Sequence, residues 1–297
     1  MSKRKTKPKV TITEEPEVKI EATPKVEGDK IDIILATHNN LGLTIECVSA
    51  LYSFTHMPFI LHVIDDSDDL TPQYFEQLNR ETGNVDYYRP SEKIEHGNQI
   101  INYGLERCST DIVAYLGNST IVEPEWLVAA HQIMKQEELV GLIGFKLLYQ
   151  TGAIEHAGMW WTPEMPHHMN IGVGEAGHRH TFVREVELVG WALVLIKREA
   201  FPQPLDTVGY IGFRGYDDVD NCMELRRRTK KLKNGEEVNW KVIYCGLGAA
   251  YHKAGATRYR DDENYSLEHE YNRKSFLKKW GGTQQAIDSV VMSRVLH

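Results

Sequence analysis

The sequence lacks the features that would place it in a membrane or outside the cell. Its four cysteines, Cys47, Cys108, Cys222 and Cys245, lie far apart and show no paired spacing of the kind that marks zinc sites. No apolar run is long enough to cross a bilayer, and the lysine-rich N-terminus has no apolar segment of a secretory signal. We therefore expect reduced thiols and a cytoplasmic protein without a transmembrane anchor.

An excess of positive charge is missing as well. The formal net charge is -8, which argues against a general affinity for nucleic acid or for an anionic membrane. There is no Gly-rich phosphate loop followed by lysine, which weakens the case for a nucleotidyltransferase. What the 297 residues do contain is 41% hydrophobic and 26% charged side chains, enough for a large core.

The composition divides the chain into three parts. Residues 1–28 are rich in Lys, Glu, Pro and Thr and poor in large apolar side chains, so we expect a disordered tail that starts with basic residues. Residues 29–262 carry the pattern of a single folded domain. Residues 263–297 are expected to form a C-terminal helical segment that packs on this domain.

Strands and helices alternate from residue 31 onward. The apolar spacing predicts strands over 31–36, 59–64, 85–88, 111–116, 140–148, 187–197 and 240–245. Helices are predicted over 44–53, 72–81, 97–107, 123–137, 218–231 and 267–280. Residues 153–185 are predicted to form a long functional loop. This rhythm indicates an α/β fold with a mainly parallel, mixed sheet that is flanked by helices.

An acidic run begins where the second predicted strand stops. Asp65 and Asp66 come directly after the apolar residues 59–64. Strand ends in open α/β sheets are where ligands bind, and a carboxylate there accepts hydrogen bonds from a nucleobase or a ribose hydroxyl. A nucleotide is therefore the first ligand to expect, and a solvated turn is the alternative interpretation.

Several short motifs, taken in order, resemble the family 2 glycosyltransferases of the GT-A fold. The resemblance covers about residues 30–260, and it implies a Rossmann-like domain that moves a sugar from a nucleoside-diphosphate sugar, expected to be a UDP-sugar, onto a hydroxyl acceptor with inversion. The motifs that carry it are Ala36-Thr37-His38-Asn39-Asn40, Ile64-Asp65-Asp66-Ser67, the stretch from Gly97-Asn98 to Gly104, Ile154-Glu155-His156-Ala157-Gly158, Val189-Gly190-Trp191-Ala192 and Gly215-Tyr216-Asp217-Asp218-Val219-Asp220.

The resemblance assigns roles on the donor side of the site. It implies that one group of residues holds the nucleoside and that a second group lies near the diphosphate. The nucleoside group is Ala36, Thr37, Asn39, Asp65 and Asp66, and the diphosphate group is Asn98, Asn118 and Ser119.

On the acceptor side, the resemblance implies that Asp218 is the general base. A sugar hydroxyl is a poor nucleophile at neutral pH, so a carboxylate within hydrogen-bond reach must take its proton. Asp217 and Trp191 are then expected to position the acceptor, since sugar rings stack on indoles. The alternative interpretation of the acidic pair is a helix N-terminus with favourable negative charge.

The metal motif departs from the family. The family generally carries Asp-x-Asp or Asn-x-Asp after the fourth strand, whereas this sequence has Gly117-Asn118-Ser119. Hard divalent cations prefer anionic oxygen ligands. Three outcomes stay open: Mn or Mg held by His252 with other acids and the diphosphate, a metal-independent site helped by donors such as Asn118, Ser119 and Lys or Arg side chains, or a chain that binds sugar nucleotide without turnover. Arg258 and Arg260 are candidate donors to the diphosphate, and solvated side chains are the alternative.

Two further questions stay open at this stage. The rival function is a nucleotide-sugar-binding module of the same fold that is weak or inactive as a catalyst. The acceptor is undetermined among a protein, a glycan, a lipid carrier and a modified base. No zinc site is expected at His167, His168, His178 and His180, because their spacing is that of loops and no cysteine lies nearby.

Overall fold

The structure of the protein is a computed structural model that describes residues 29–161, 166–169, 171–172, 174, 180–213, 215–253 and 263–281. The expected tail, residues 1–28, lies outside the described residues, as do His178, Arg258 and Arg260. No helix within the described ranges combines the length and apolarity needed to span a bilayer.

A single large sheet forms the centre of the molecule, in the strand order β10-β14-β6-β11-β4-β1-β2-β3. All of these strands run in one direction except β10 and β11, so the predicted mainly parallel, mixed sheet is confirmed. The bounds of its strands are β1 Ile31–Thr37, β2 Phe59–Asp65, β3 Val85–Tyr88, β4 Ile112–Gly117, β6 Val140–Leu148, β10 Val183–Val186, β11 Leu193–Lys197 and β14 Lys241–His252. Two short strands extend it, β5 Thr120–Val122 beside β14 and β7 Ile154–His156 beside β6.

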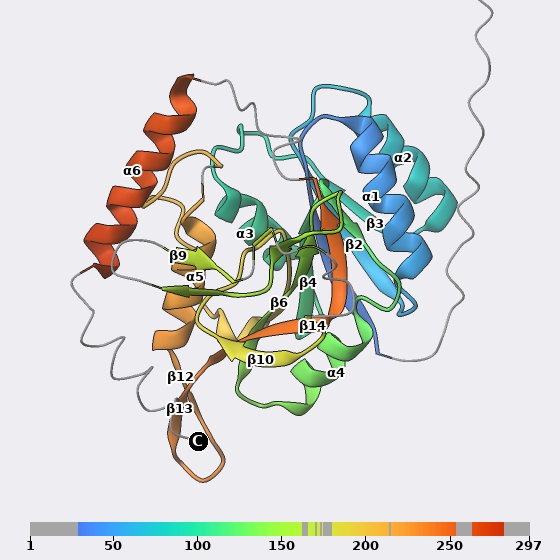
Figure 1. Cartoon of the computed structure of the whole chain (residues 1–297). Helices are drawn as coiled ribbons and strands as arrows, with labels where there is room; N and C mark the ends of the chain where they lie inside the picture. Colours follow the sequence, from blue (N-terminus) through green and yellow to red (C-terminus); the bar gives the residue numbers. More distant parts are fainter. Residues whose placement is uncertain are drawn as a thin grey trace, which may run out of the picture.

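Helices cover both faces of this sheet, as the continuous apolar strands require. On β1, Ile33 and Leu35 face one core and Ile34 faces the other. The first face is covered by α1 Leu41–Phe54, α2 Thr71–Thr82 and α4 Val128–Gln136. The second is covered by α3 Gly97–Arg107, α5 Asp217–Arg227 and α6 Glu263–Trp280. In Figure 1, α1 and α2 lie on one flank of the molecule and α5 and α6 on the other.

One glycine sets how closely α3 approaches the sheet. A Cβ atom on Gly104 would lie 2.5 Å from the side chain of Ile34 on β1. Only glycine leaves room for this contact, which fixes the position of the helix whose N-terminus reaches the site.

The predicted loop over residues 153–185 contains short strands instead. Besides β7 and β10, it holds the pair β8 Met159–Trp161 and β9 Pro166–His168. The strand predicted over 187–197 begins only at Leu193, because residues 191–192 form a turn. Three- and four-residue strands are stabilised by their partners, which no local pattern reveals.

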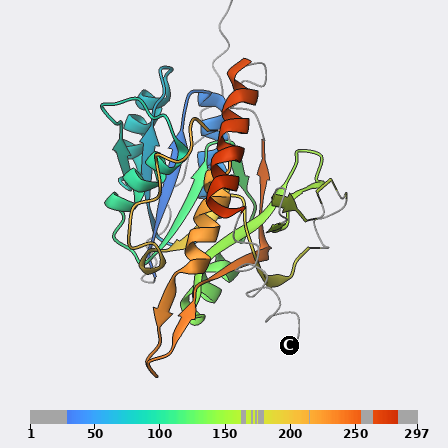
Figure 2. The ribbon, with the colours of Figure 1, turned by 90° about the vertical axis from the view of Figure 1, so that its left-hand side faces the viewer.

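The helix predicted over 218–231 ends at Arg227, and the chain turns into a hairpin. Strands β12 Thr229–Lys231 and β13 Glu237–Asn239 pair across a turn in which Gly235 has φ 86°. The hairpin projects from the body of the molecule (Figures 1 and 2). The helix predicted over 123–137 begins at Val128, after Glu125 at φ 60°, and a single 3-10 turn, Arg198–Ala200, follows β11.

Candidate active site

A cavity of about 480 Å³ opens where the carboxyl end of β4 meets the N-termini of α3 and α5; we call it the site cavity. The other elements that line it are β5, β6, β7, β8, β9, the segment 190–192, the end of β14 and one residue of α6. Of the residues singled out in the sequence, those that line the site cavity are Asn98, Ser119, Trp191, Asp217, Asp218 and His252. Those that do not are Ala36, Thr37, Asn39, Asp65, Asp66 and Asn118.

The N-terminus of α5 presents two carboxylates to the site cavity. Gly215 has φ 79° and Tyr216, which is buried, has φ 73°, a conformation that is costly for a bulky side chain. This strained entry turns the chain so that Asp217 and Asp218 begin the helix half-buried at the wall. The first residue of α3 faces them, since a Cβ atom on Gly97 would lie 2.9 Å from Oδ2 of Asp217.

Asp220, two residues further along α5, has a different environment. Its Oδ1 accepts a hydrogen bond from Nε1 of Trp280 at 2.6 Å, and its Oδ2 is 2.9 Å from Nζ of Lys279. Asp220 is 1% exposed and ties α6 to α5, which lie together in Figure 2. Among the acidic residues of this turn, Asp217 and Asp218 are therefore the two that line the site cavity.

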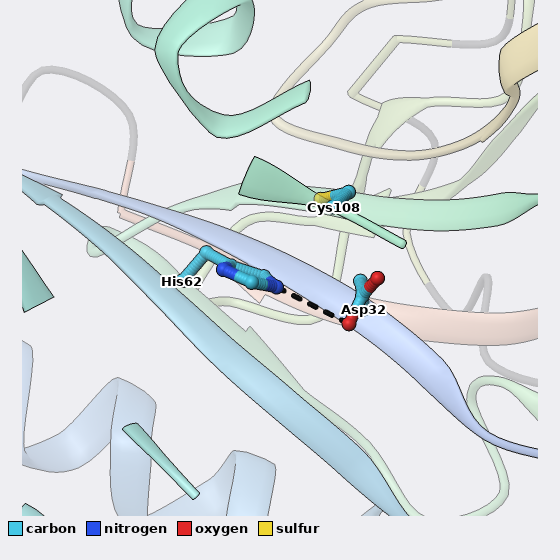
Figure 3. Close-up of side chains that lie close together, drawn as sticks. All are labelled: Asp32, His62 and Cys108. Atoms are coloured by element: carbon cyan, nitrogen blue, oxygen red, sulfur yellow. Dashed lines mark ion pairs between the residues drawn. The ribbon is translucent and has the colours of Figure 1, made fainter. Parts of the chain in front are cut away.

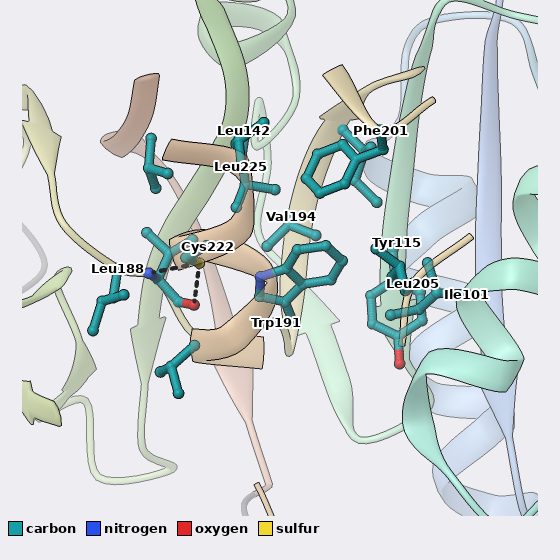
Figure 4. Packing of buried hydrophobic residues seen from close by; sticks show 14 of the residues in the cluster. Ile101, Tyr115, Leu142, Leu188, Trp191, Val194, Phe201, Leu205, Cys222 and Leu225 are labelled. Carbon is teal, nitrogen blue, oxygen red and sulfur yellow. Dashed lines mark hydrogen bonds between the residues drawn. The ribbon is translucent and has the colours of Figure 1, made fainter. Parts of the chain in front are cut away.

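The thiol of Cys222 fixes α5 against the segment before β11. Its Sγ donates to the carbonyl oxygen of Val189 and accepts from the Val189 N–H, both at 3.5 Å (Figure 4). Trp191 lies beside this contact and is 7% exposed, with its ring edge-on to Phe201 at 5.9 Å. Trp191 thus forms a packed wall of the site cavity, with little ring surface open to a sugar.

Hydrogen bonding determines the tautomers of two histidines in the site cavity. Nε2 of His156 accepts from the N–H groups of Gly158 and Gly190, at 3.3 and 3.4 Å, so the ring carries its proton on Nδ1. That proton is shared with Nδ1 of His168, 3.3 Å away, which leaves Nε2 of His168 as a donor.

The electrostatic environment favours the neutral form of both rings. Burial, with smaller contributions from His168 and His252, lowers the pKa of His156 to about 3. Desolvation also lowers the pKa of His168, against the opposing charges of Asp218 and Glu155. The pair therefore offers the site cavity a neutral hydrogen-bond donor on His168. The sequence identified His156 only within a family motif and gave His168 no role in the site.

His252 contacts the carboxylate of Glu155, a residue to which the sequence analysis assigned no separate role. Nδ1 of His252 lies 2.9 and 3.0 Å from the two carboxylate oxygens of Glu155. Strand pairing sets Thr120 opposite His252, and the carbonyl oxygen of Ser119 accepts from the N–H of Lys253 at 2.9 Å. Ser119, where the family carries a carboxylate, thus lies beside a Glu–His pair contributed by β7 and β14.

The acidic run after β2 separates into inner and outer carboxylates. Asp65 is fully buried; it accepts from Oγ1 of Thr37 and from the hydroxyl of Tyr87, each at 2.7 Å, and also from Ser67. Asp66 is half-buried. Asp65 is therefore engaged in supporting the loop, and Asp66 is nearer its surface.

The two asparagines predicted beside a diphosphate have their amides engaged in packing. Nδ2 of Asn118 donates to the carbonyl oxygen of Asn39 and to Oγ1 of Thr44, at 3.2 and 3.0 Å. Asn98 is fully buried and exchanges side-chain hydrogen bonds with Asn221 of α5. Asn118 therefore fixes the loop after β1, and Asn98 fixes the junction of α3 with α5.

Comparison with known proteins relates the first part of the fold to a family. A family model described as glycosyl transferase family 2 matches residues 32–176, a range that ends before Trp191 and Asp218. An uncharacterised protein, y4gI of Sinorhizobium fredii, is 24% identical over 266 residues. That match covers 82% of this chain but only 26% of the relative, so this chain spans about a quarter of the relative's length.

Solved structures share the fold. GalNAc-T7 with UDP, GalNAc and Mn²⁺ matches with a TM-score of 0.60 and 13% identity, over 86% of this chain and 52% of that one. A mannosyltransferase of Pyrobaculum calidifontis with GDP-Man and Mn²⁺ matches with a TM-score of 0.55 and 14% identity, over 84% of this chain and 63% of that one. S. aureus TarS 1-349 with UDP-GlcNAc matches with a TM-score of 0.54 and 14% identity, over 84% of this chain and 67% of that one. These likenesses confirm the predicted GT-A fold class.

Proposed function

Since residues 32–176 match the model of glycosyl transferase family 2, we propose that this chain transfers the sugar of a UDP-sugar to a hydroxyl acceptor in the site cavity. The observation that carries the proposal is that Asp217 and Asp218 share this cavity with Ser119, Glu155 and His252. One cavity thus holds candidate groups for the acceptor hydroxyl and for the departing diphosphate, which a displacement reaction needs on opposite sides of the anomeric carbon.

The donor nucleoside is proposed to bind along the carboxyl ends of β2 and β1. Asp66 is the carboxylate assigned to the base, with Asn39, Thr37 and Ala36 around it. Pairing of Ala36 with Gly117 sets the end of β1 beside the end of β4, where Ser119 begins the cavity wall. A nucleotide laid across these strand ends brings its diphosphate to Ser119 and its sugar toward α5.

Asp218 is proposed to act as the general base and to produce inversion by a single in-line displacement. Its carboxylate takes the proton of the acceptor hydroxyl while the hydroxyl oxygen attacks the anomeric carbon and the diphosphate departs. Nε2–H of His168 is suited to donate a hydrogen bond to an oxygen in the cavity. Its Nδ1 already accepts from His156, so His168 has no free lone pair with which to compete as a base.

Glu155 and His252 fit a divalent cation with the help of the substrate. A carboxylate and an imidazole suit Mn²⁺, and such ions take their remaining ligands from substrate phosphates and water. Two protein ligands match this pattern, in which Glu155 supplies the anionic oxygen that Ser119 does not. When bound, the cation neutralises negative charge on the departing diphosphate.

The rival function is a binding module that holds the nucleotide sugar without turnover, and the altered Asp-x-Asp position is the observation that favours it. Release of UDP from a panel of UDP-sugars, measured with Mn²⁺, with Mg²⁺ and with EDTA, tests both functions. We expect release of UDP from at least one sugar nucleotide, and faster release with a cation. Binding of UDP without release under any condition would favour the module.

The acceptor and the cellular location stay predictions. A protein, a glycan, a lipid carrier or a modified base would each supply the hydroxyl that Asp218 needs. The cytoplasmic location rests on the composition alone.

A further inference from the structure

A second group of ligating side chains lies away from the site cavity. Asp32 on β1, His62 on β2 and Cys108 just before β4 have one ligand atom each within 4.8 Å of one another, and all three are buried (Figure 3). None of them lines the site cavity. Asp32 is the second residue of β1 and Cys108 precedes β4, so this group lies toward the opposite end of the same strands.

Two polar atoms in this group are buried without a hydrogen bond. Oδ1 of Asp32 and Nε2 of His62 make none within the described part of the chain, although they lie 3.2 Å apart as an ion pair. The side chains that carry them are 1% and 5% exposed. Buried polar atoms are almost always satisfied, so these two atoms share either a proton or a cation.

The other atoms of the same two side chains are firmly held. Oδ2 of Asp32 accepts from the backbone N–H groups of Ser109 and Thr110 and from both of their hydroxyls. Oδ1 is thus aimed inward by a carboxylate that cannot rotate without breaking these bonds.

His62 is held in the same way from the other side. Its Nδ1 lies 2.9 Å from Oδ2 of Asp86. The Asp86 carboxylate also accepts two hydrogen bonds from Arg107, at 2.7 and 2.9 Å. A histidine that binds a metal through one ring nitrogen usually donates the N–H of its other ring nitrogen to a carboxylate, as His62 does to Asp86.

We propose that Asp32 Oδ1, His62 Nε2 and Cys108 Sγ bind a zinc ion. Carboxylate oxygen, imidazole nitrogen and thiolate sulfur are the ligands that zinc takes in proteins, and softer or harder ions match this mixture less well. Tetrahedral zinc holds its ligand atoms about 3.5 Å apart, and these three lie within 4.8 Å of one another, so they need to approach by about 1.3 Å at most. A fourth position is left for water. The ion joins β1, β2 and the end of α3 and is independent of the transfer reaction.

Zinc content and cobalt spectroscopy of the full chain test this proposal. The purified protein is dialysed against micromolar free zinc and then against metal-free buffer, and the bound metal is measured by mass spectrometry. Replacement of the zinc by Co²⁺ gives a thiolate-to-cobalt absorption band only where a cysteine is a ligand. A metal held by Glu155 and His252 has no sulfur ligand, so the band separates the two sites.

We expect one zinc-binding site with this band in the wild type and in Cys47→Ser, which alters a buried thiol outside the group. Cys108→Ser is expected to lose the band, and Asp86→Asn to weaken zinc binding by about 10- to 100-fold. A wild type that shows no cobalt–thiolate band overturns the proposal and favours a charged His62 between two carboxylates. A Cys108→Ser protein with an unchanged band would overturn it equally, and the wild-type spectrum does not depend on the folding of any variant.

Discussion

The two ends of the central strands β4, β1 and β2 use similar residue types in opposite ways. Beyond the carboxyl end of β4, carboxylates and imidazoles from α5, β7, β9, β14 and α6 line a cavity of about 480 Å³. Away from this cavity, Asp32, His62 and Cys108 lie close together in the buried interior, and His62 is held by Asp86. The site cavity has room for a substrate. The ligand atoms of Asp32, His62 and Cys108 lie within 4.8 Å of one another, a separation suited to a single ion.

This difference shows that residue type alone does not define a site. A carboxylate that lines a cavity, as Asp218 does, is a candidate for catalysis. A carboxylate that is buried among other side chains, as Asp32 is, is a candidate for a structural role. The following substitutions separate the two cases, because a catalytic change should lower activity at constant stability and a structural change should do the reverse.

The largest effect is expected for Asp218→Asn, which removes the proposed base but keeps the size and most hydrogen bonds of the side chain. Loss of a general base lowers the rate by about 10²- to 10⁴-fold. UDP release should fall by this factor, whereas the affinity for UDP and the free energy of unfolding should stay unchanged. Asp68→Asn, at an exposed carboxylate beside Arg89, is the matched control. A normal rate in Asp218→Asn would show that another group is the base.

Asp220→Ala should destabilise the protein by about 3 kcal/mol. It leaves the Trp280 N–H buried without an acceptor and removes the charge that faces Lys279. Unfolding in urea measures this loss. Glu224→Ala removes a partly exposed partner of the same lysine and should cost less than about 1 kcal/mol. Equal losses in both variants would mean that α6 is not anchored through Asp220.

Zinc should stabilise the fold without altering nucleotide binding. At a free zinc concentration about 100 times the Kd, the gain is about 2.7 kcal/mol for a ligand that binds only the folded state. We expect this gain in the wild type and in Cys47→Ser, and none in Cys108→Ser. Denaturant unfolding with and without zinc measures it, and a full gain in Cys108→Ser would contradict the assignment.

Acidification should destabilise the fold through His156. Its pKa is about 3 in the folded protein and about 6.5 when unfolded, so below pH 6.5 the unfolded chain takes up a proton that the folded chain does not. Stability is therefore lost as the pH falls, by about 1.4 kcal/mol per unit, or about 2 kcal/mol between pH 6.5 and pH 5. His156→Gln should remove this share of the pH dependence, whereas substitution of His56, which is exposed, should not. Identical pH profiles for wild type and His156→Gln would contradict the neutral, buried form.

Much of the fold was predictable because its signals are local. The apolar runs of β1 and β2 and the helical spacing of α1 are properties of consecutive residues, and their alternation predicts a parallel sheet. The short strands β8 and β9 and the end of α5 at Arg227 depend on pairing with other segments. Such tertiary contacts override local preference, so no window of sequence contains them.

The structure brings together only part of the site that the motifs predicted, since the predicted nucleoside-binding residues do not line the site cavity. The residues near the cavity were found through motifs, but burial decides what each one does. Asp65 and Asp66 look equivalent in the sequence, and only the hydroxyls of Thr37 and Tyr87 distinguish them. The partners of Asp220 and His252 lie far away along the chain, and nothing local indicates them.

The central claim is that a sugar nucleotide bound in the site cavity presents its anomeric carbon to residue 218. Crystals of Asp218→Asn soaked with Mn²⁺ and the UDP-sugar that the wild type cleaves test it directly. The account predicts the base beside Asp66, the diphosphate beside Ser119, Glu155 and His252, and the sugar directed toward Asn in place of Asp218. A nucleotide bound elsewhere, or a sugar that points away from α5, would contradict it.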